Sequence, residues 1–221
     1  MKKLLLVIIL ILLMQISKAQ SVLVNASEPD AKIIVDGQDL GTGTLKIKIP
    51  KESCVDVKIQ KVGFLSYEQT YCNKKGATSP PKKQYFDMKM DDAEQASVKA
   101  DQANVDFAIE VNKKYDLTEA WKLTTQIVTD YFDAIEVSDK ETSYLRTAWN
   151  IQTFQQNTVR TRLIIKLGNS DPLIFKVKLV SEFSGINGTS VKADEQFREW
   201  DRILRKYQNV IGDFSTRLGT K

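Results

Sequence analysis

Residues 54–72 read CVDVKIQKVGFLSYEQTYC, and this stretch decides how the N-terminal part of the chain folds. Two runs rich in alternating apolar side chains, 55–61 and 65–71, flank a three-residue segment that contains Gly63, a pattern typical of a β-hairpin. One antiparallel register places apolar residues on one face and sets Cys54 opposite Cys72. Its other pairs are Val55 with Tyr71, Asp56 with Thr70, Lys58 with Glu68, Ile59 with Tyr67 and Lys61 with Leu65.

This register predicts a disulfide between the only two cysteines of the chain. Two cysteines that face each other across paired strands form a bridge readily under oxidising conditions. Closing a loop of this size stabilises a fold by about 3 kcal/mol. The alternative is a redox-active pair, which the absence of a CxxC motif disfavours.

The first residues predict export. Lys2 and Lys3 precede an apolar run, 4–14, and the small residues Ser17 and Ala19 follow it, which is the pattern of a secretory signal peptide cleaved after Ala19. A helix needs about 20 apolar residues to cross a bilayer, so an uncleaved anchor is the weaker alternative. No cysteine follows the run directly, so lipid attachment there is not expected. We predict a mature chain without a membrane span.

The amino-acid composition argues against several classes of protein function. The chain has 221 residues, of which 42% are hydrophobic and 27% charged, so it has enough apolar side chains to fold. It has no histidine, the commonest general base and metal ligand. The formal charge of +4 includes three lysines of the signal peptide, without which 29 basic residues face 28 acidic ones. This balance argues against a nucleic-acid partner, since phosphate binding needs an excess of cations.

Residues 20–90 are predicted to form an all-β sandwich. Short alternating runs at 22–24, 32–36, 44–49 and 84–90 surround the hairpin, with turns rich in glycine and proline between them. The alternation, with Ile47 and Ile49 on one side, suits two sheets that each have one buried face.

This region resembles the PEGA family of surface β domains over about residues 21–90. The motif residues are Pro29, Asp30 and Ala31, the strand 33–35, Asp36, Gly37 and Gly41, followed by Val55, Val57 and Ile59 and the Gly63–Phe64 corner. The sequence departs from the family pattern at 42–44 and 50–52. The resemblance implies an exported or envelope-associated binding or spacer module without catalytic residues.

Residues 91–104 are predicted to be an acidic linker, with a part-helical segment as the open alternative. The segment has few large apolar side chains. Its charged residues are Asp91, Asp92, Glu94 and Asp101 against Lys99.

Residues 105–221 are predicted to form an α+β domain with the order strand, helix, strands, helix. We expect a strand at 105–111 and a helix whose N-cap is Thr118. Strands then follow at 135–137, 144–153, 158–167 and 173–183. Apolar residues at three-and-four spacing from Phe197 to Leu218 predict a long helix over about 193–216, lying across an antiparallel sheet.

This order resembles the helix-grip modules of envelope lipoproteins, among which the BamC family of outer-membrane assembly accessory proteins is the nearest. Ala120 and Trp121, the turn 137–139 and the strand 144–147 carry the resemblance over about residues 105–218. The lipid-bearing cysteine of such proteins is missing.

One local excess of cations marks a candidate contact for an anionic partner. We expect a hairpin register that sets Arg162 opposite Lys178, with the apolar residues on the other face. Like charges that face each other are relieved by an anionic ligand. The alternative is a solvated face whose cations pair with neighbouring acidic residues. The candidate residues are Arg160, Arg162, Lys166, Lys176 and Lys178.

The leading hypothesis is a non-catalytic, soluble, exported protein of a bacterial envelope, periplasmic or associated with the outer envelope, that docks to an envelope protein or a cell-surface glycan. We expect no catalytic, metal or cofactor residues. Trp121, Trp149 and Trp200 could form a sugar platform, but helical spacing places two of them in a core. The alternatives are a glycan hydrolase that uses two carboxylates, and a carrier of an apolar ligand between sheet and helix.

Overall fold

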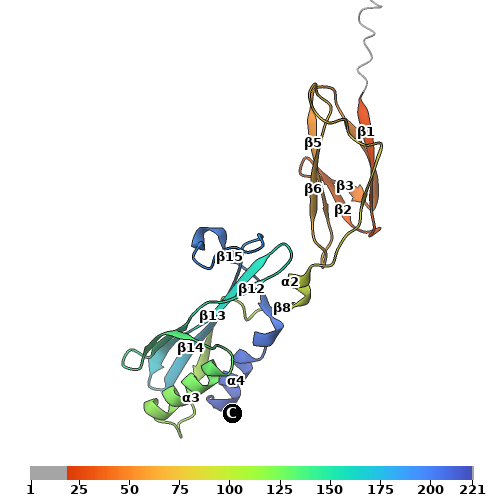
Figure 1. Ribbon diagram of the computed structural model, residues 1–221. Helices are drawn as coiled ribbons and strands as arrows, with labels where there is room; N and C mark the ends of the chain where they lie inside the picture. The colour runs from red at the N-terminus through yellow and green to blue at the C-terminus, as the bar shows by residue number, and fades with distance from the viewer. Residues whose placement is uncertain (1–18, 221) are drawn as a thin grey trace, which may run out of the picture. The chain divides into compact units, whose positions relative to one another are not determined.

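The computed structural model describes residues 19–220 (Figure 1). The predicted signal peptide therefore lies outside the described residues, except for Ala19. The chain divides into two compact units, one ending at Met90 and the other beginning at Asp91. Among the residues that the structure describes, no helix has both the length and the apolar character that a membrane crossing needs.

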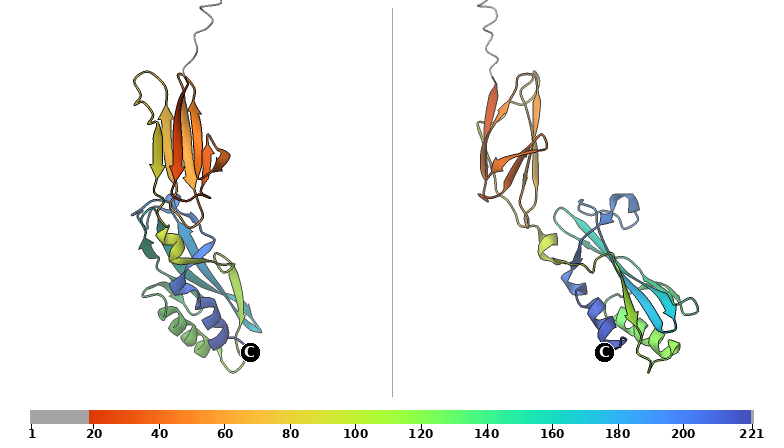
Figure 2. Two further views of the ribbon diagram at one scale, coloured as in Figure 1. Left: turned by 90° about the vertical axis from the view of Figure 1, so that its right-hand side faces the viewer. Right: turned by 180° about the vertical axis from the view of Figure 1, so that it is seen from behind.

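The first unit is a β-sandwich, as predicted. A three-stranded sheet of order β4-β1-β7 faces a four-stranded sheet of order β3-β2-β5-β6 (Figure 2). Both inner faces are apolar and pack into one core. The strands are β1 (Gln20–Ala26), β2 (Lys32–Val35), β3 (Gln38–Thr42), β4 (Thr44–Ile49), β5 (Cys54–Gln60), β6 (Tyr67–Cys72) and β7 (Lys83–Phe86).

β3 was not predicted from the sequence. Asp36 and Gly37 both have positive φ, 48° and 82°, so they turn the chain tightly from β2 into β3.

The β5–β6 hairpin has the predicted register. Cys54 pairs with Cys72, Val55 with Tyr71 and Ile59 with Tyr67. The two cysteines form the disulfide, with their sulfurs 2.00 Å apart. Lys58 and Glu68 form the expected cross-strand ion pair at 2.9 Å. The expected pair of Lys61 with Leu65 lies outside the ladder, because the strands end at Gln60 and Tyr67.

The linker prediction for residues 91–104 is wrong. The segment contains a helical turn, α2 (Asp92–Gln95), and a strand, β8 (Ser97–Lys99), both within the second unit. Arg202 anchors them: its Nε donates to the Ser97 hydroxyl at 2.8 Å, and a terminal nitrogen donates to the Glu94 carbonyl at 3.1 Å. Ser97 is fully buried. Small alanines, rather than large apolar side chains, pack this segment onto the core.

The second unit is built on a seven-stranded sheet. β13 lies beside β14 on one side. On its other side it pairs with β11 along one part of its length and with β12 along another. β14 also pairs with β9 and with β15. The predicted strand 144–153 is divided into β11 and β12. The strands are β9 (Asp106–Glu110), β10 (Ile135–Asp139), β11 (Tyr144–Thr147), β12 (Asn150–Thr153), β13 (Thr158–Ser170), β14 (Leu173–Phe183) and β15 (Arg198–Glu199).

Two helices, α3 (Leu117–Thr129) and α4 (Val210–Arg217), cover one face of this sheet (Figure 2). The first starts earlier than predicted. Its N-cap is Asp116 rather than Thr118, because the Asp116 carboxylate accepts from the backbone N–H of Glu119 and the Glu119 side chain accepts from that of Asp116. This reciprocal capping box satisfies two donors that a helix start otherwise leaves unpaired.

The long C-terminal helix is not present, so that prediction is wrong. Residues 194–217 form the 3-10 turns η1 (Asp194–Gln196) and η2 (Arg205–Tyr207), the strands β15 and β16 (Arg202–Leu204), and the short helix α4. β16 pairs with β8, so backbone pairing in the folded unit outweighs the helical pattern. The apolar residues are nevertheless buried where the pattern places them, in the core.

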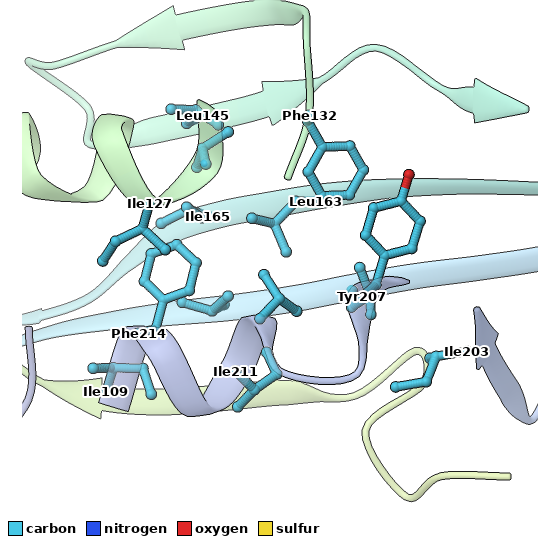
Figure 3. Packing of buried hydrophobic residues seen from close by; sticks show 14 of the residues in the cluster. Ile109, Ile127, Phe132, Leu145, Leu163, Ile165, Ile203, Tyr207, Ile211 and Phe214 are labelled. Carbon is cyan, nitrogen blue, oxygen red and sulfur yellow. The ribbon is translucent and has the colours of Figure 1, made fainter. Parts of the chain in front are cut away.

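Side chains fill the space between the sheet and the helices (Figure 3). Leu163 and Ile165 of β13 contact the layer formed by Ile127 of α3 and Phe214 of α4. Phe132 stacks on Tyr207 with ring centroids 4.8 Å apart. The carrier hypothesis places its apolar ligand in this layer, which the core side chains occupy.

Candidate binding surface on the open face of the sheet

The candidate cations of β13 and β14 lie on the sheet face opposite the helices. Residues directly paired across strands share a face, and the odd-numbered apolar residues of both strands belong to the core under α3 and α4. Their even-numbered neighbours therefore point the other way. Neither α3 nor α4 lies on this second face, which we call the open face; among the described residues, the 3-10 turn η1 contacts it only at Arg160.

The expected register of this hairpin is wrong by two residues. Arg162 lies opposite Val180, and Lys178 lies opposite Ile164. A bulge between Leu167 and Asn169 changes the register on the way to the tight turn. A shift of two residues leaves every side chain on its predicted face, so the division into cationic and apolar faces is confirmed.

Arg160 does not belong to the open surface. Its side chain is 4% exposed. Its guanidinium pairs with Glu182 and Asp194, each at 2.6 Å. It also lies 4.2 Å from the ring centroid of Trp149 and 4.1 Å from that of Phe197. The prediction that Arg160 contacts a partner is therefore wrong, because its charge holds the segment after β14 against the sheet.

Lys166 is exposed but has an acidic partner. Its ammonium lies 2.8 Å from a carboxylate oxygen of Asp106 on β9. The hydrogen bond from Lys166 lowers the pKa of Asp106 below its usual value. Lys166 also lies directly opposite Lys176, so Asp106 reduces the repulsion between two facing cations. For Lys166, the structure therefore agrees with the alternative in which the cation pairs with a neighbouring acidic residue.

The side chain of Arg162 makes no hydrogen bond with residues 19–220. Its guanidinium lies 4.0 Å from the ring centroid of Trp149, a cation–π contact that fixes its position. Its Nε is buried and makes no hydrogen bond. Burial, followed by the charge of Arg146, lowers the pKa of Arg162. Arginine still keeps its charge at neutral pH, so this side chain is a positioned donor without an acceptor.

Lys176 and Lys178 complete the set. Neither forms an ion pair within the described residues; Lys176 is exposed and Lys178 half-buried. We call the three residues Arg162, Lys178 and Lys176 the cation row. Between them lie Ile164, which is half-buried, and Val180, which is 8% exposed. The open face thus combines three unpaired cations with an apolar floor.

Two neighbours of the cation row were missed from sequence. Arg146 lies opposite Ile164 on β11 and pairs with Glu136 at 3.0 Å. Trp149 contacts both arginines of β13. The signal for Arg146 was its position in the predicted strand 144–153, but nothing in the local sequence indicates which strand lies beside β13.

The sugar-platform and glycan-hydrolase hypotheses find little support on this face. Trp121 and Trp200 are buried in the core, and the ring of Trp149 is occupied by guanidinium groups, so the three do not form a sugar platform. The pKa of Asp106 is lowered, whereas a general acid needs a raised one. No group of three metal-ligating side chains occurs in the part of the chain that the structure describes.

Comparison of the chain with protein-family models, with curated proteins and with solved structures finds no match. The geometry of the molecule therefore carries the functional argument by itself.

Proposed function

We propose that this chain is a non-catalytic binding protein that docks to an anionic partner through the open face of its second unit. The observation that carries the proposal is the cation row. Arg162, Lys178 and Lys176 lie on the open face and form no ion pair with the described residues, although the charge of Asp106 acts on both lysines. The terminal nitrogens of Arg162 also make no hydrogen bond within the described residues, and a carboxylate that accepts from them forms a charge-assisted hydrogen bond.

The two units have separate roles in this proposal. The first is a PEGA-like module that acts as a spacer or second contact, and the disulfide Cys54–Cys72 supports this because it suits an exported domain. The second is a helix-grip-like module, in which a sheet is covered by helices on one face and left open on the other.

We further propose that the protein acts in a bacterial envelope, in the periplasm or at the outer envelope, after removal of a signal peptide at Ala19. Three features support this location. The N-terminal sequence has the pattern of a signal peptide. The two cysteines are joined in a disulfide. No spanning helix occurs among residues 19–220.

Two polymers test the function, one a polypeptide and one a glycan. Binding of polyglutamate and of polygalacturonate to the full chain is measured by titration calorimetry at low ionic strength, where surface charges are least screened. We expect at least one polymer to bind. The triple variant R162Q/K176Q/K178Q should lose about tenfold or more in affinity.

A matched triple variant provides the control. Lys113, Lys122 and Lys140 are exposed lysines before α3, on α3 and in the turn after β10. Changing all three to Gln lowers the net charge by the same amount, and should leave the affinity within about twofold. If neither polymer binds, or if both triple variants lose affinity equally, the proposal is wrong.

A further inference from the structure

We propose that the cation row recognises an extended acidic peptide of a partner protein, in which every second residue is acidic. This inference rests on the proposed function and names the chemical class of the partner. It follows from the spacing of the three cations, from the residues between them and from the surroundings of Trp149.

The spacing of the cation row matches an extended peptide. Arg162, Lys178 and Lys176 lie at three successive levels of the β13–β14 ladder, because Arg162 faces Val180, Lys178 faces Ile164 and Lys176 faces Lys166. Successive levels on one face of a sheet are two residues apart, or about 7 Å. Side chains on one face of an extended peptide repeat at the same distance. A peptide laid along the strands therefore presents one carboxylate to each cation.

The floor between the cations favours a peptide over a glycan. Ile164 and Val180 are apolar and lie at the first two levels, where the methylene groups of the partner's acidic side chains can cover them. An acidic glycan binds best where an aromatic ring is free to stack on a sugar. On this face, Trp149 already contacts the guanidinium groups of Arg160 and Arg162.

Arg162 is the anchor of the site. Its guanidinium is held on Trp149, and its buried Nε lacks an acceptor. A carboxylate can accept two parallel hydrogen bonds from one guanidinium, which gives both energy and orientation. The two lysines are less constrained, since they have neither an aromatic contact nor an ion pair among the described residues.

Asp106 carries a negative charge that repels an acidic ligand. Removing this charge should therefore strengthen binding, whereas removing a cation should weaken it. It lies opposite Lys178 on β9 and holds Lys166 at 2.8 Å. The change D106N removes one negative charge beside the cation row and frees Lys166 for the ligand. We expect Asp106 to weaken the binding of an acidic partner, because like charges repel each other.

The experiment uses a synthetic peptide in which Glu and Val alternate, titrated into the full chain. Two control peptides have the same length: one has Gln in place of Glu, and the other has the same composition with the Glu residues adjacent in one block. Polygalacturonate serves as the glycan arm. We expect the alternating peptide to bind at least about fivefold more tightly than the block peptide, and the Gln peptide to show no binding.

The variants locate the contact. R162Q/K176Q/K178Q should weaken binding of the alternating peptide about tenfold or more, whereas D106N should strengthen it about threefold. Since Arg162 packs on Trp149, the double variant K176Q/K178Q is measured as well. It changes only lysine side chains outside the core and should lose about threefold or more.

Each contrary outcome has a distinct meaning. Equal affinity for the alternating and block peptides overturns the spacing argument, although the proposed function would stand. Binding of polygalacturonate through the cation row, without binding of the peptide, identifies a glycan partner and overturns the inference alone. If none of the anionic probes binds the full chain, the proposed function is wrong as well.

Discussion

Arg160 and Arg162 lie two residues apart on the same face of β13, yet they have opposite surroundings. Arg160 is enclosed by two carboxylates and two aromatic rings, whereas Arg162 has one ring and no hydrogen bond. The sequence places both on the cationic face but does not distinguish them. The two carboxylates and Phe197 come from residues 182–197, and the second ring is Trp149, so only the folded chain shows which arginine is structural.

Arg160 is predicted to be a stability residue. The change R160M leaves Glu182 beside a buried site without its cation, and breaking such a pair lowers the free energy of unfolding by about 3 kcal/mol. Urea denaturation measures this loss. R162M is the matched control and should change stability by less than about 1 kcal/mol. Similar losses for the two variants would contradict the assignment of Arg162 to the open face.

Tyr131 gives a pH-dependent prediction. Burial and then its hydrogen bond to Asp213, at 2.6 Å, raise its pKa to about 12. In the unfolded chain a tyrosine side chain has a pKa of about 10. Because the folded pKa is higher, the stabilisation is present below about pH 10 and lost as the pH rises toward 12.

The variant Y131F isolates this contribution. It should be less stable than the unchanged protein at neutral pH, and the difference should shrink between about pH 10 and 12. Chemical denaturation across this range measures both. A stability difference that does not change with pH would show that the phenol of Tyr131 keeps an ordinary pKa.

At the scale of the element, the two hairpins show when register can be predicted. In β5–β6, the charge pair Lys58–Glu68, the two cysteines and the apolar face all favour one register, and that register is observed. In β13–β14, the face alternation is equally clear, but the predicted register left out the cross-strand pair Arg160–Glu182, which is present in the observed register. A bulge near the turn shifts the pairing further. Alternation defines the face of a residue, whereas register needs a second constraint.

The C-terminal segment shows the limit of apolar periodicity. The apolar residues of 197–218 have helical spacing and are buried as expected, but only 210–217 form an α-helix, and strands and turns bury the others. Pairing of β16 with β8 requires residues 91–104 to be folded in the same unit. Since that segment was interpreted as a linker, its pairing partner could not be foreseen, and one misinterpretation produced the other.

Arg202 is the element-scale test of this arrangement. Its contacts with Ser97 and Glu94 hold α2 and β8. We expect R202M to lower the free energy of unfolding by about 2 kcal/mol and to speed tryptic cleavage after Lys99. R198M, which changes an exposed arginine of β15, should do neither. Equal cleavage rates in R202M and the unchanged protein would contradict a folded role for residues 91–104.

At the scale of the whole molecule, the disulfide belongs to the first unit alone. Reduction should therefore affect one unit selectively. Scanning calorimetry with and without dithiothreitol should show two transitions, of which one falls by more than about 10 °C on reduction and the other stays in place. A single transition that shifts as a whole would mean that the two units unfold as one.

Whole-molecule charge is close to balanced once the predicted signal peptide is set aside, so overall attraction cannot account for binding to an anionic partner. Recognition must come from where the cations lie. The cation row provides such a location because its three members share one open face, while Arg160 and Lys166 are already paired.

The affinity of two triple variants for one acidic chain tests this claim most directly. R162Q/K176Q/K178Q and K113Q/K122Q/K140Q have the same net charge and differ only in where the cations are lost. The account predicts that the first binds polyglutamate or polygalacturonate about tenfold or more weakly than the unchanged protein, and that the second binds within about twofold of it. Equal affinities for the two variants would contradict it.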